Sequence, residues 1–350
     1  MTRSIIALII AVVVAYLTTP LMIRLAKLVG AIDVPRDERR VHKVPTPRLG
    51  GLAIYLGFIA GLLYYTEINS RMLGVLIGAT MIVVLGFFDD IKPLSAKFKL
   101  MVQIVAASVA IYSGVRISYV TNPLHFLIGG EYIHFGLWTY PLTLFWIVGV
   151  TNAINLVDGL DGLAAGISGI SATTLFVAAL GTGQHFAAIL AALIAASTLG
   201  FLPHNFNPAK IFMGDTGALF LGYMLSVISV MGVLKGAAAL SILVPIFAIG
   251  LPIFDTLLAM VRRALSGKSM MEADKGHLHH KLLAAGMSQK QAVLTLYSIS
   301  AILGFSAVAL VEVTLKAAFV LVFAVFLLGS MGAKYLGLIE VGQGSNKADL

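Results

Sequence analysis

The 350-residue chain contains no cysteine, so neither a disulfide framework nor thiolate chemistry is available to it. Charged residues are also scarce, because Asp, Glu, Lys and Arg together make up only 11% of the sequence. The mean hydropathy of +0.96 lies far above the range of soluble globular domains. These shortages exclude an ordinary soluble domain and indicate an integral membrane protein.

The sequence is rich in long hydrophobic runs that carry almost no charged residues. Runs of about 17 to 25 apolar residues recur, each long enough to cross about 30 Å of hydrocarbon as a helix. The first run is too long for a signal peptide and lacks a small-residue cleavage site, so we expect a retained span. We predict an all-α membrane bundle forming one domain over residues 1–350, with about eleven transmembrane helices near 4–26, 50–66, 70–88, 98–114, 137–153, 160–180, 185–202, 215–233, 237–261, 291–311 and 316–336.

The basic residues predict the orientation of this bundle. If the N-terminus lies outside, all but five of the 24 Lys and Arg residues fall on the inner side, the exceptions being Arg3, Arg71, Arg116, Lys235 and Lys316. The positive-inside rule then places the C-terminus in the cytoplasm. The net charge of +8 is explained by loops beside anionic lipid headgroups, not by nucleic acid. Among the outer loops, 115–136 is long enough for a small hairpin around Gly129-Gly130, between Phe126-Leu127-Ile128 and Tyr132-Ile133-His134.

Acidic residues collect on the inner side as well. Of 16 Asp and Glu residues, only Glu67, Glu131 and Glu312 fall outside. Several of the others lie at the inner ends of predicted spans. Inserting each such carboxylate into the membrane costs about 2.5 to 3.5 kcal/mol of free energy. Their repeated placement at one face of the membrane favours a shared polar site.

The stretch NAINLVDGLDG at 152–162 places four polar residues in an apolar segment. Asn152, Asn155 and Asp158 are spaced by three, so they lie along one helix stripe, and Asp161 follows after a glycine. Helix capping and turn formation at the next span are the alternative interpretation. Capping accounts for one aspartate but leaves the other polar residues unexplained.

Two more acidic motifs lie at inner span ends. Asp89 and Asp90 in FFDD could simply face headgroups, yet adjacent carboxylates in a partly desolvated place tend to hold a proton or recruit a cation. Lys97 and Lys99 follow them. Asp215 in MGDTG is either a helix cap or a ligand beside backbone N–H groups that can approach a phosphate.

Histidines cluster in KGHLHHK at 275–281, within the longest inner loop. His277, His279 and His280 without cysteine make a poor tetrahedral zinc cage, so a solvated basic loop or recognition of an anionic or nucleobase ligand remain. The first inner loop, DVPRDERRVHKVPTPRLGG, adds Asp33 and Arg48 among prolines that keep it extended.

Carboxylates and an amide with Lys, Arg and His around them are typical of a magnesium site that handles phosphates. At a membrane face, this chemistry favours transfer of a phosphorylated group between a soluble donor and a lipid. An ion-coupled transporter is the alternative from another class, but its ionisable residues should lie near mid-membrane.

Four motifs in this order resemble the polyprenyl-phosphate N-acetylhexosamine-1-phosphate transferases: FFDD (87–90), NAINLVDGLDG (152–162), MGDTG (213–217) and HLHH (277–280). The H-x-H-H form, the eleven spans and the first inner loop are similar to the bacterial WecA/TagO branch. In the MurNAc-pentapeptide branch a run of adjacent histidines is usual, whereas Leu278 interrupts the run here.

The resemblance implies transfer of GlcNAc-1-phosphate from UDP-GlcNAc to undecaprenyl phosphate at the cytoplasmic face of the bacterial plasma membrane, with release of UMP. Another UDP-N-acetylhexosamine or a MurNAc-pentapeptide donor is the alternative, and a homodimer is left open. It also implies Mg²⁺, replaceable by Mn²⁺, with Asp215 as principal ligand and Asn155 as second ligand. It further implies catalytic roles for Asp89, Asp90 and Asp215, and substrate-binding roles for Lys97, Lys99, Asn152, Asp158, Asp161, His277, His279, His280, Asp33 and Arg48.

The implied reaction is a single in-line displacement, in which positioning and charge neutralisation dominate. A covalent aspartyl intermediate is the rival chemistry. Whether Asp89 is an obligatory general base is left open, because a phosphate monoester has a second pKa of about 6 and is already anionic near neutral pH.

Overall fold

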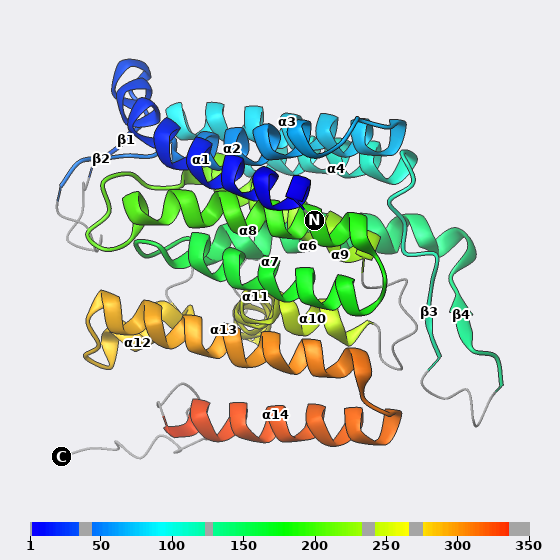
Figure 1. The fold of residues 1–350 in the computed structure, drawn as a ribbon. Coiled ribbons are helices and arrows are strands. Elements are labelled where there is room, and N and C mark those ends of the chain that lie inside the picture. Colours follow the sequence, from blue (N-terminus) through cyan, green and yellow to red (C-terminus); the bar gives the residue numbers. More distant parts are fainter. Residues whose placement is uncertain (1, 35–43, 123–128, 233–241, 266–275, 336–350) are drawn as a thin grey trace, which may run out of the picture.

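The computed structural model describes residues 2–34, 44–122, 129–232, 242–265 and 276–335, which are almost entirely helical (Figure 1). The longer helices are α1 (Thr2–Val29), α2 (Gly50–Tyr65), α3 (Ser70–Ile91), α4 (Ala96–Tyr112), α6 (Thr139–Val157), α7 (Leu163–Gly181), α8 (His185–Asn205), α9 (Gly214–Gly232), α11 (Gly250–Leu265), α13 (Gln289–Glu312) and α14 (Leu315–Tyr335). The short ones are η1 (Gly136–Trp138), α10 (Leu243–Ala248) and α12 (Leu278–Ala284).

Seven of the described helices are long and apolar enough to cross a membrane: α1, α3, η1 continued by α6, α7, α8, α9 and α13. The helix α2 and residues 315–331 of α14 are apolar but shorter. The helix α4 has 17 residues and carries Lys97 and Lys99 in its first turn. The chain is therefore a multi-pass all-α membrane protein, and each predicted span coincides with a helix except the ninth.

The predicted ninth span, 237–261, is not one continuous helix. Its residues 237–241 lie outside the described ranges, and the rest is divided at Ile249 between α10 and α11. Pro252 explains the break, because it has no N–H to donate to the carbonyl of Ala248 and its ring excludes a helical continuation. In Figure 1 α11 is viewed nearly along its axis, so it crosses the other helices.

The helix α9 forms the centre of the bundle. In its apolar stretch 89% of the residues are buried, the largest share among the seven helices that could cross a membrane. The helix packs against α2, α3, α6, α7 and α8. Glycines bring its first turn close to two neighbours: a Cβ on Gly51 of α2 would lie 2.0 Å from the nitrogen of Gly217, and one on Gly86 of α3 would lie 2.4 Å from the Cα of Thr216. Small residues of this kind allow membrane helices to approach at the backbone. This packing brings the C-terminal end of α3 to the N-terminal end of α9.

Two small hairpins lie at opposite ends of the bundle (Figure 1). At the end that also carries α12, β1 (Ile32–Asp33) pairs antiparallel with β2 (Thr46–Pro47). At the other end, β3 (Tyr119–Thr121) pairs antiparallel with β4 (Tyr132–His134), as expected for a hairpin within 115–136. The first strand of that hairpin is 119–121, whereas 126–128 lie outside the described residues. Residues 35–43 of the first inner loop and 266–275 of the long inner loop also lie outside them.

Candidate active site

A lysine and two aspartates from three helices meet at the end of the bundle that carries β1, β2 and α12. Lys99, in the first turn of α4, donates to Asp89 Oδ2 and to Asp215 Oδ2, each at 3.0 Å. Asp89 ends α3 and also accepts from the backbone N–H of Leu94 at 2.7 Å. The lysine is half-buried, so its charge offsets two carboxylates in a region of reduced dielectric. We call Asp89, Lys99 and Asp215 the acidic cluster.

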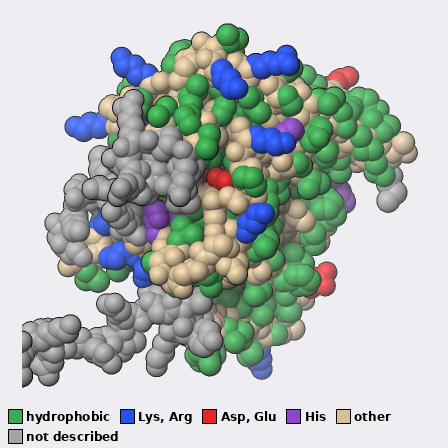
Figure 2. Space-filling model, turned by 90° about the vertical axis from the view of Figure 1, so that its left-hand side faces the viewer, with side chains coloured by type: hydrophobic (Ala, Val, Ile, Leu, Met, Phe, Trp, Pro, Cys, Tyr) green, Lys and Arg blue, Asp and Glu red, His purple; other side chains and the backbone are tan. Residues whose placement is uncertain are grey.

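The surface at this end is mixed in charge. Figure 2 shows Lys and Arg side chains around a small acidic patch, with histidine side chains beside it. A negatively charged ligand is attracted by such basic surroundings, while the carboxylates provide oxygen ligands for a cation.

Asp90 contacts a different set of donors from Asp89. Its carboxylate accepts from the backbone N–H groups of Asp215 and Thr216, each at 3.0 Å, and from Thr216 Oγ1 at 2.6 Å. Arg48 Nε also donates to it at 3.1 Å. Asp90 therefore acts as an N-cap for α9, supplied by a different helix.

Gly214 makes this capping arrangement sterically accessible. Its φ of +69° lies in the left-handed region, and a Cβ there would be 2.4 Å from Asp90 Oδ2 and 2.1 Å from the carbonyl oxygen of Arg48. The glycine before Asp215 thus lets α3 and the strand β2 close on the start of α9.

We expect Asp90→Asn to lower thermal stability as well as turnover. The amide NH₂ cannot accept from the donors that now surround one carboxylate oxygen, so buried N–H groups of α9 lose a partner, at a cost of about 1 to 3 kcal/mol. Thermal unfolding of the purified protein in detergent, run beside Glu312→Gln as an exposed-carboxylate control, measures this loss. An unchanged melting temperature would show that the cap is dispensable.

The two asparagines of the NAINLVDGLDG stretch have different surroundings. Asn155 interacts through its side chain with Asp215, which joins it to the acidic cluster. Asn152 lies one turn earlier on α6 and pairs with Gln103 of α4, donating to Gln103 Oε1 at 2.6 Å and accepting from Gln103 Nε2 at 3.3 Å. Since Gln103 stands one turn after Lys99, this amide pair fixes α4 against α6 where the cluster forms.

The two aspartates of the same stretch also differ. Asp158 ends α6, and burial raises its pKa to about 7, with the neighbouring carboxylates of Asp215 and Asp90 adding to the effect. Asp161 Oδ2 accepts from Asn207 Nδ2 at 2.9 Å and from the backbone N–H of Ala209 at 3.0 Å. Asp161 thereby ties the α6–α7 turn to the α8–α9 connection, while Asp158 stays electrostatically coupled to the cluster.

The HLHH motif lies against this turn. The ring of His279 is 3% exposed and packs on Gly159, where a Cβ would be 2.4 Å from its Nε2. Burial, followed by the neighbouring His280, lowers the pKa of His279 to about 4, so its ring is uncharged at neutral pH. His280 lies with its ring centroid 4.2 Å from that of His279. The histidine loop and the α6–α7 turn thus form one continuous surface.

The remaining predicted residues are Arg48, Asp33 and Lys97. Arg48 reaches it through Asp90, and β1 places Asp33 opposite Thr46 in the same small hairpin. Lys97 is exposed on α4, two residues before Lys99 and so on a different face. Sequence reasoning missed Gln103, although an amide in an apolar helix one turn after Lys99 is a usable signal. It also left Asp255 out of the site.

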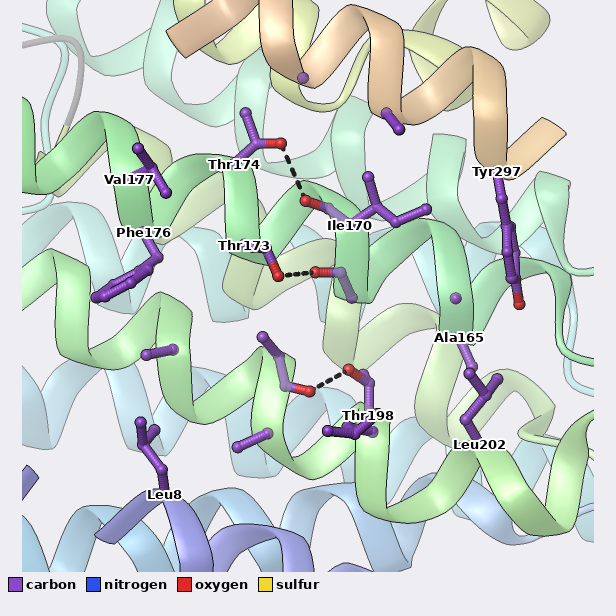
Figure 3. Close-up of a pocket in the computed structure, with 18 of the residues that line it drawn as sticks. Leu8, Ala165, Ile170, Thr173, Thr174, Phe176, Val177, Thr198, Leu202 and Tyr297 are labelled. Carbon is purple, nitrogen blue, oxygen red and sulfur yellow. Dashed lines mark hydrogen bonds between the residues drawn. The ribbon is translucent and has the colours of Figure 1, made fainter. Parts of the chain in front are cut away.

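A separate apolar cavity of about 750 Å³ lies between α1, α7, α8 and α13 (Figure 3). Thr173 and Thr174 on its wall donate their hydroxyl groups to carbonyls of their own helix. Tyr297 stands at one end, and its hydroxyl donates to the carbonyl of Gly162 at 2.5 Å. Among the described residues that line the cavity there is no carboxylate or amine, which separates it from the chemistry of the acidic cluster.

Comparison with known proteins gives the family. Residues 72–233 match the family model of glycosyl transferase family 4. Over 97% of its length the chain is 43% identical to a Bacillus subtilis protein named as a probable undecaprenyl-phosphate N-acetylglucosaminyl 1-phosphate transferase, covering 94% of that protein. The chain belongs to the polyprenyl-phosphate N-acetylhexosamine-1-phosphate transferases. It is therefore a member of a family of membrane-bound transferases.

Other relatives show the breadth of this transferase family. The chain is 30% identical over 80% of its length to an Escherichia coli O157:H7 undecaprenyl-phosphate alpha-N-acetylglucosaminyl 1-phosphate transferase, covering 76% of it. It is 31% identical over 86% of its length to a Halalkalibacterium halodurans phospho-N-acetylmuramoyl-pentapeptide-transferase, covering 95% of it. The family-model match contains the acidic cluster and Asn155 but ends before the HLHH motif.

Proposed function

We propose that this transferase moves GlcNAc-1-phosphate from UDP-GlcNAc to undecaprenyl phosphate and releases UMP. The observation that carries the proposal is the meeting of Asp89, Lys99 and Asp215 at 3.0 Å contacts, with Asn155 beside Asp215, at one end of a membrane bundle. The name of the Bacillus subtilis relative supports the same donor and acceptor class. The product would be undecaprenyl-diphospho-GlcNAc, a lipid-linked intermediate for an envelope glycan.

The proposal places the acidic cluster at the cytoplasmic face of the bacterial plasma membrane. The basic inner loops support this side, and the β3–β4 hairpin at the opposite end would then face outward. Eleven spans with an outer N-terminus and an inner C-terminus are part of this proposal. A water-soluble sugar nucleotide and a lipid phosphate can meet only at such a boundary.

The oxygen donors in the cluster suit a magnesium ion. Asp215 and Asn155 supply one carboxylate and one amide oxygen, and Mg²⁺ usually takes one or two carboxylates while phosphates and water complete its shell. Within the described ranges, no group of three or more His, Cys, Asp or Glu side chains is arranged to hold a metal. A site that shares its ion with substrate phosphates needs no such group. Mg²⁺, or Mn²⁺ in its place, would neutralise charge on the diphosphate when bound.

The protein's own residues would position the two phosphates. An oxygen of undecaprenyl phosphate attacks the phosphorus that carries the sugar, the new P–O bond forms, and the bond from that phosphorus to the bridging oxygen breaks as UMP leaves with this oxygen. The ammonium group of Lys99 would exchange its bond to Asp89 or Asp215 for a bond to a substrate phosphate. Asp89 would orient the acceptor phosphate. Because the acceptor oxygen is already anionic, positioning outweighs proton removal.

The HLHH surface would serve the sugar-nucleotide side. Gly159→Ala should raise the KM for UDP-GlcNAc by about tenfold, because the added Cβ displaces the His279 ring and misplaced contacts weaken ground-state binding. The KM for undecaprenyl phosphate should stay the same. Gly149→Ala, on the preceding helix α6, is the control, since a Cβ there meets no atom within 4 Å. Equal changes in both KM values would contradict this assignment.

A donor panel tests the proposed substrates. Purified protein with undecaprenyl phosphate and Mg²⁺ is given UDP-GlcNAc, UDP-GalNAc or UDP-MurNAc-pentapeptide, and the lipid-linked product is identified by mass spectrometry. We expect efficient product only from UDP-GlcNAc. A preference for UDP-MurNAc-pentapeptide would contradict the proposed donor and would favour the group in the name of the Halalkalibacterium halodurans relative, phospho-N-acetylmuramoyl-pentapeptide.

A further inference from the structure

A buried carboxylate outside the acidic cluster holds the HLHH helix in place. Asp255 of α11 is 4% exposed, and both of its oxygens are used: Oδ2 contacts His277 Nδ1 at 2.8 Å and Oδ1 accepts from the backbone N–H of Leu278 at 2.9 Å. Leu278 is the first residue of α12, whose N-cap His277 makes no side-chain capping bond. Asp255 thus caps α12 from another helix, as Asp90 caps α9.

The same contact sets the chemistry of the His277 ring. An ionised carboxylate only accepts hydrogen bonds, so Nδ1 of His277 must carry the hydrogen. Nε2 is then the ring atom left for further bonding, and in the neutral ring it is an acceptor. Asp255 therefore selects both the orientation and the tautomer of His277.

A chain of ring contacts connects this pair to the α6–α7 turn. His277 stacks on His279 with centroids 5.9 Å apart and planes 8° apart, and His279 packs on Gly159. Gly159 directly follows Asp158, which is coupled to the acidic cluster. The position of α11 is thereby transmitted to the α6–α7 turn.

We infer that Asp255 is a positioning residue for the sugar-nucleotide side of the site, acting through His277. This inference rests on the proposed function. A buried carboxylate with its hydrogen-bond partner adds little net stability compared with apolar residues of similar volume, because desolvation offsets the attraction. The Asp255 contacts instead fix the positions of the His277 and His279 rings.

The test combines kinetics with a double-mutant cycle. Asp255→Asn keeps the side-chain volume, but its single amide oxygen can accept from only one of the two donors, His277 Nδ1–H or the N–H of Leu278. Asp255→Leu removes both acceptors, and His277→Phe keeps an aromatic ring while removing both nitrogens. Each should raise the KM for UDP-GlcNAc by about tenfold and leave the KM for undecaprenyl phosphate within about twofold, and the double variant should be no worse than the stronger single one. Glu312→Gln, which removes an exposed carboxylate at the far end of α13, is the control.

Additive effects, equal changes in both KM values, or wild-type kinetics would overturn the inference. If Asp255→Asn does not fold, His277→Phe alone must reproduce the selective KM change. A ¹⁵N spectrum of the histidine rings needs no turnover: Asp255→Leu, which leaves no acceptor for Nδ1–H, should shift His277 from the Nδ1–H form, and an unchanged tautomer would overturn the inference. Absence of lipid-linked product from the wild type would instead refute the proposed function and leave the tautomer result standing.

Discussion

Asp215→Asn should lower turnover by about three orders of magnitude or more, equivalent to about 4 kcal/mol of transition-state stabilisation. Asp215 is the carboxylate that Lys99 and Asn155 share, so its charge is the feature on which cation and phosphate positioning depend. The backbone N–H that Asp90 caps remains in the variant, and one of two facing carboxylates is neutralised. The melting temperature should therefore stay within a few degrees of the wild-type value.

Steady-state UMP release and thermal unfolding of the same preparation test this result. Glu312→Gln is the control for loss of an exposed carboxylate and should behave as the wild type. Wild-type turnover in Asp215→Asn would remove Asp215 from the metal and catalytic assignments. A large fall in melting temperature would show instead that its charge is structural.

Lys99→Met is the second change with a large expected effect. The substitution leaves Asp89 facing Asp215 without the ammonium group that now lies 3.0 Å from each. Two adjacent carboxylates in a desolvated site cannot both stay charged, so one takes up a proton or the ends of α3 and α9 separate. We expect turnover to fall by about 100-fold or more and the melting temperature to fall as well, because one partner of a partly buried ion cluster is lost.

Turnover and melting temperature of Lys99→Met are compared with those of Lys92→Met, which removes an exposed lysine at the C-cap of α3. The comparison separates the cluster from a general loss of positive charge. Lys97→Met adds a further test, because this exposed lysine was expected beside the phosphates yet lies on a different face of α4. Turnover of Lys99→Met within about twofold of wild type would contradict the central place given to Lys99.

The membrane architecture and the gathering of motifs could be predicted from sequence because both follow from one-dimensional patterns. Apolar run length gives the helices, and the topology puts Asp89, Asp215 and Asn155 on one face of the membrane. The break between α10 and α11 was missed although Pro252 is visible in the sequence. Hydropathy alone does not report a missing backbone donor.

The division of labour among neighbouring residues could not be predicted. Asp89 and Asp90 are adjacent, yet one contacts Lys99 and the other caps α9, because adjacent helix positions point about 100° apart. The pairing of Asn152 with Gln103 and of Asp161 with Asn207 depends on how helices cross. Capping is the alternative interpretation for the NAINLVDGLDG stretch and for Asp215, whereas the structure has it at Asp90 and Asp255, where the cap is supplied across helices and not within one.

The most direct test of the central claim is release of UMP from UDP-GlcNAc by purified protein and Mg²⁺, measured with and without undecaprenyl phosphate. The account predicts UMP and undecaprenyl-diphospho-GlcNAc in equal amounts when both substrates are present, and no UMP without the acceptor. A stoichiometric burst of UMP without acceptor, with phosphosugar retained on the protein, would contradict the single displacement. Absence of UMP with every donor and divalent cation would contradict the transferase assignment itself.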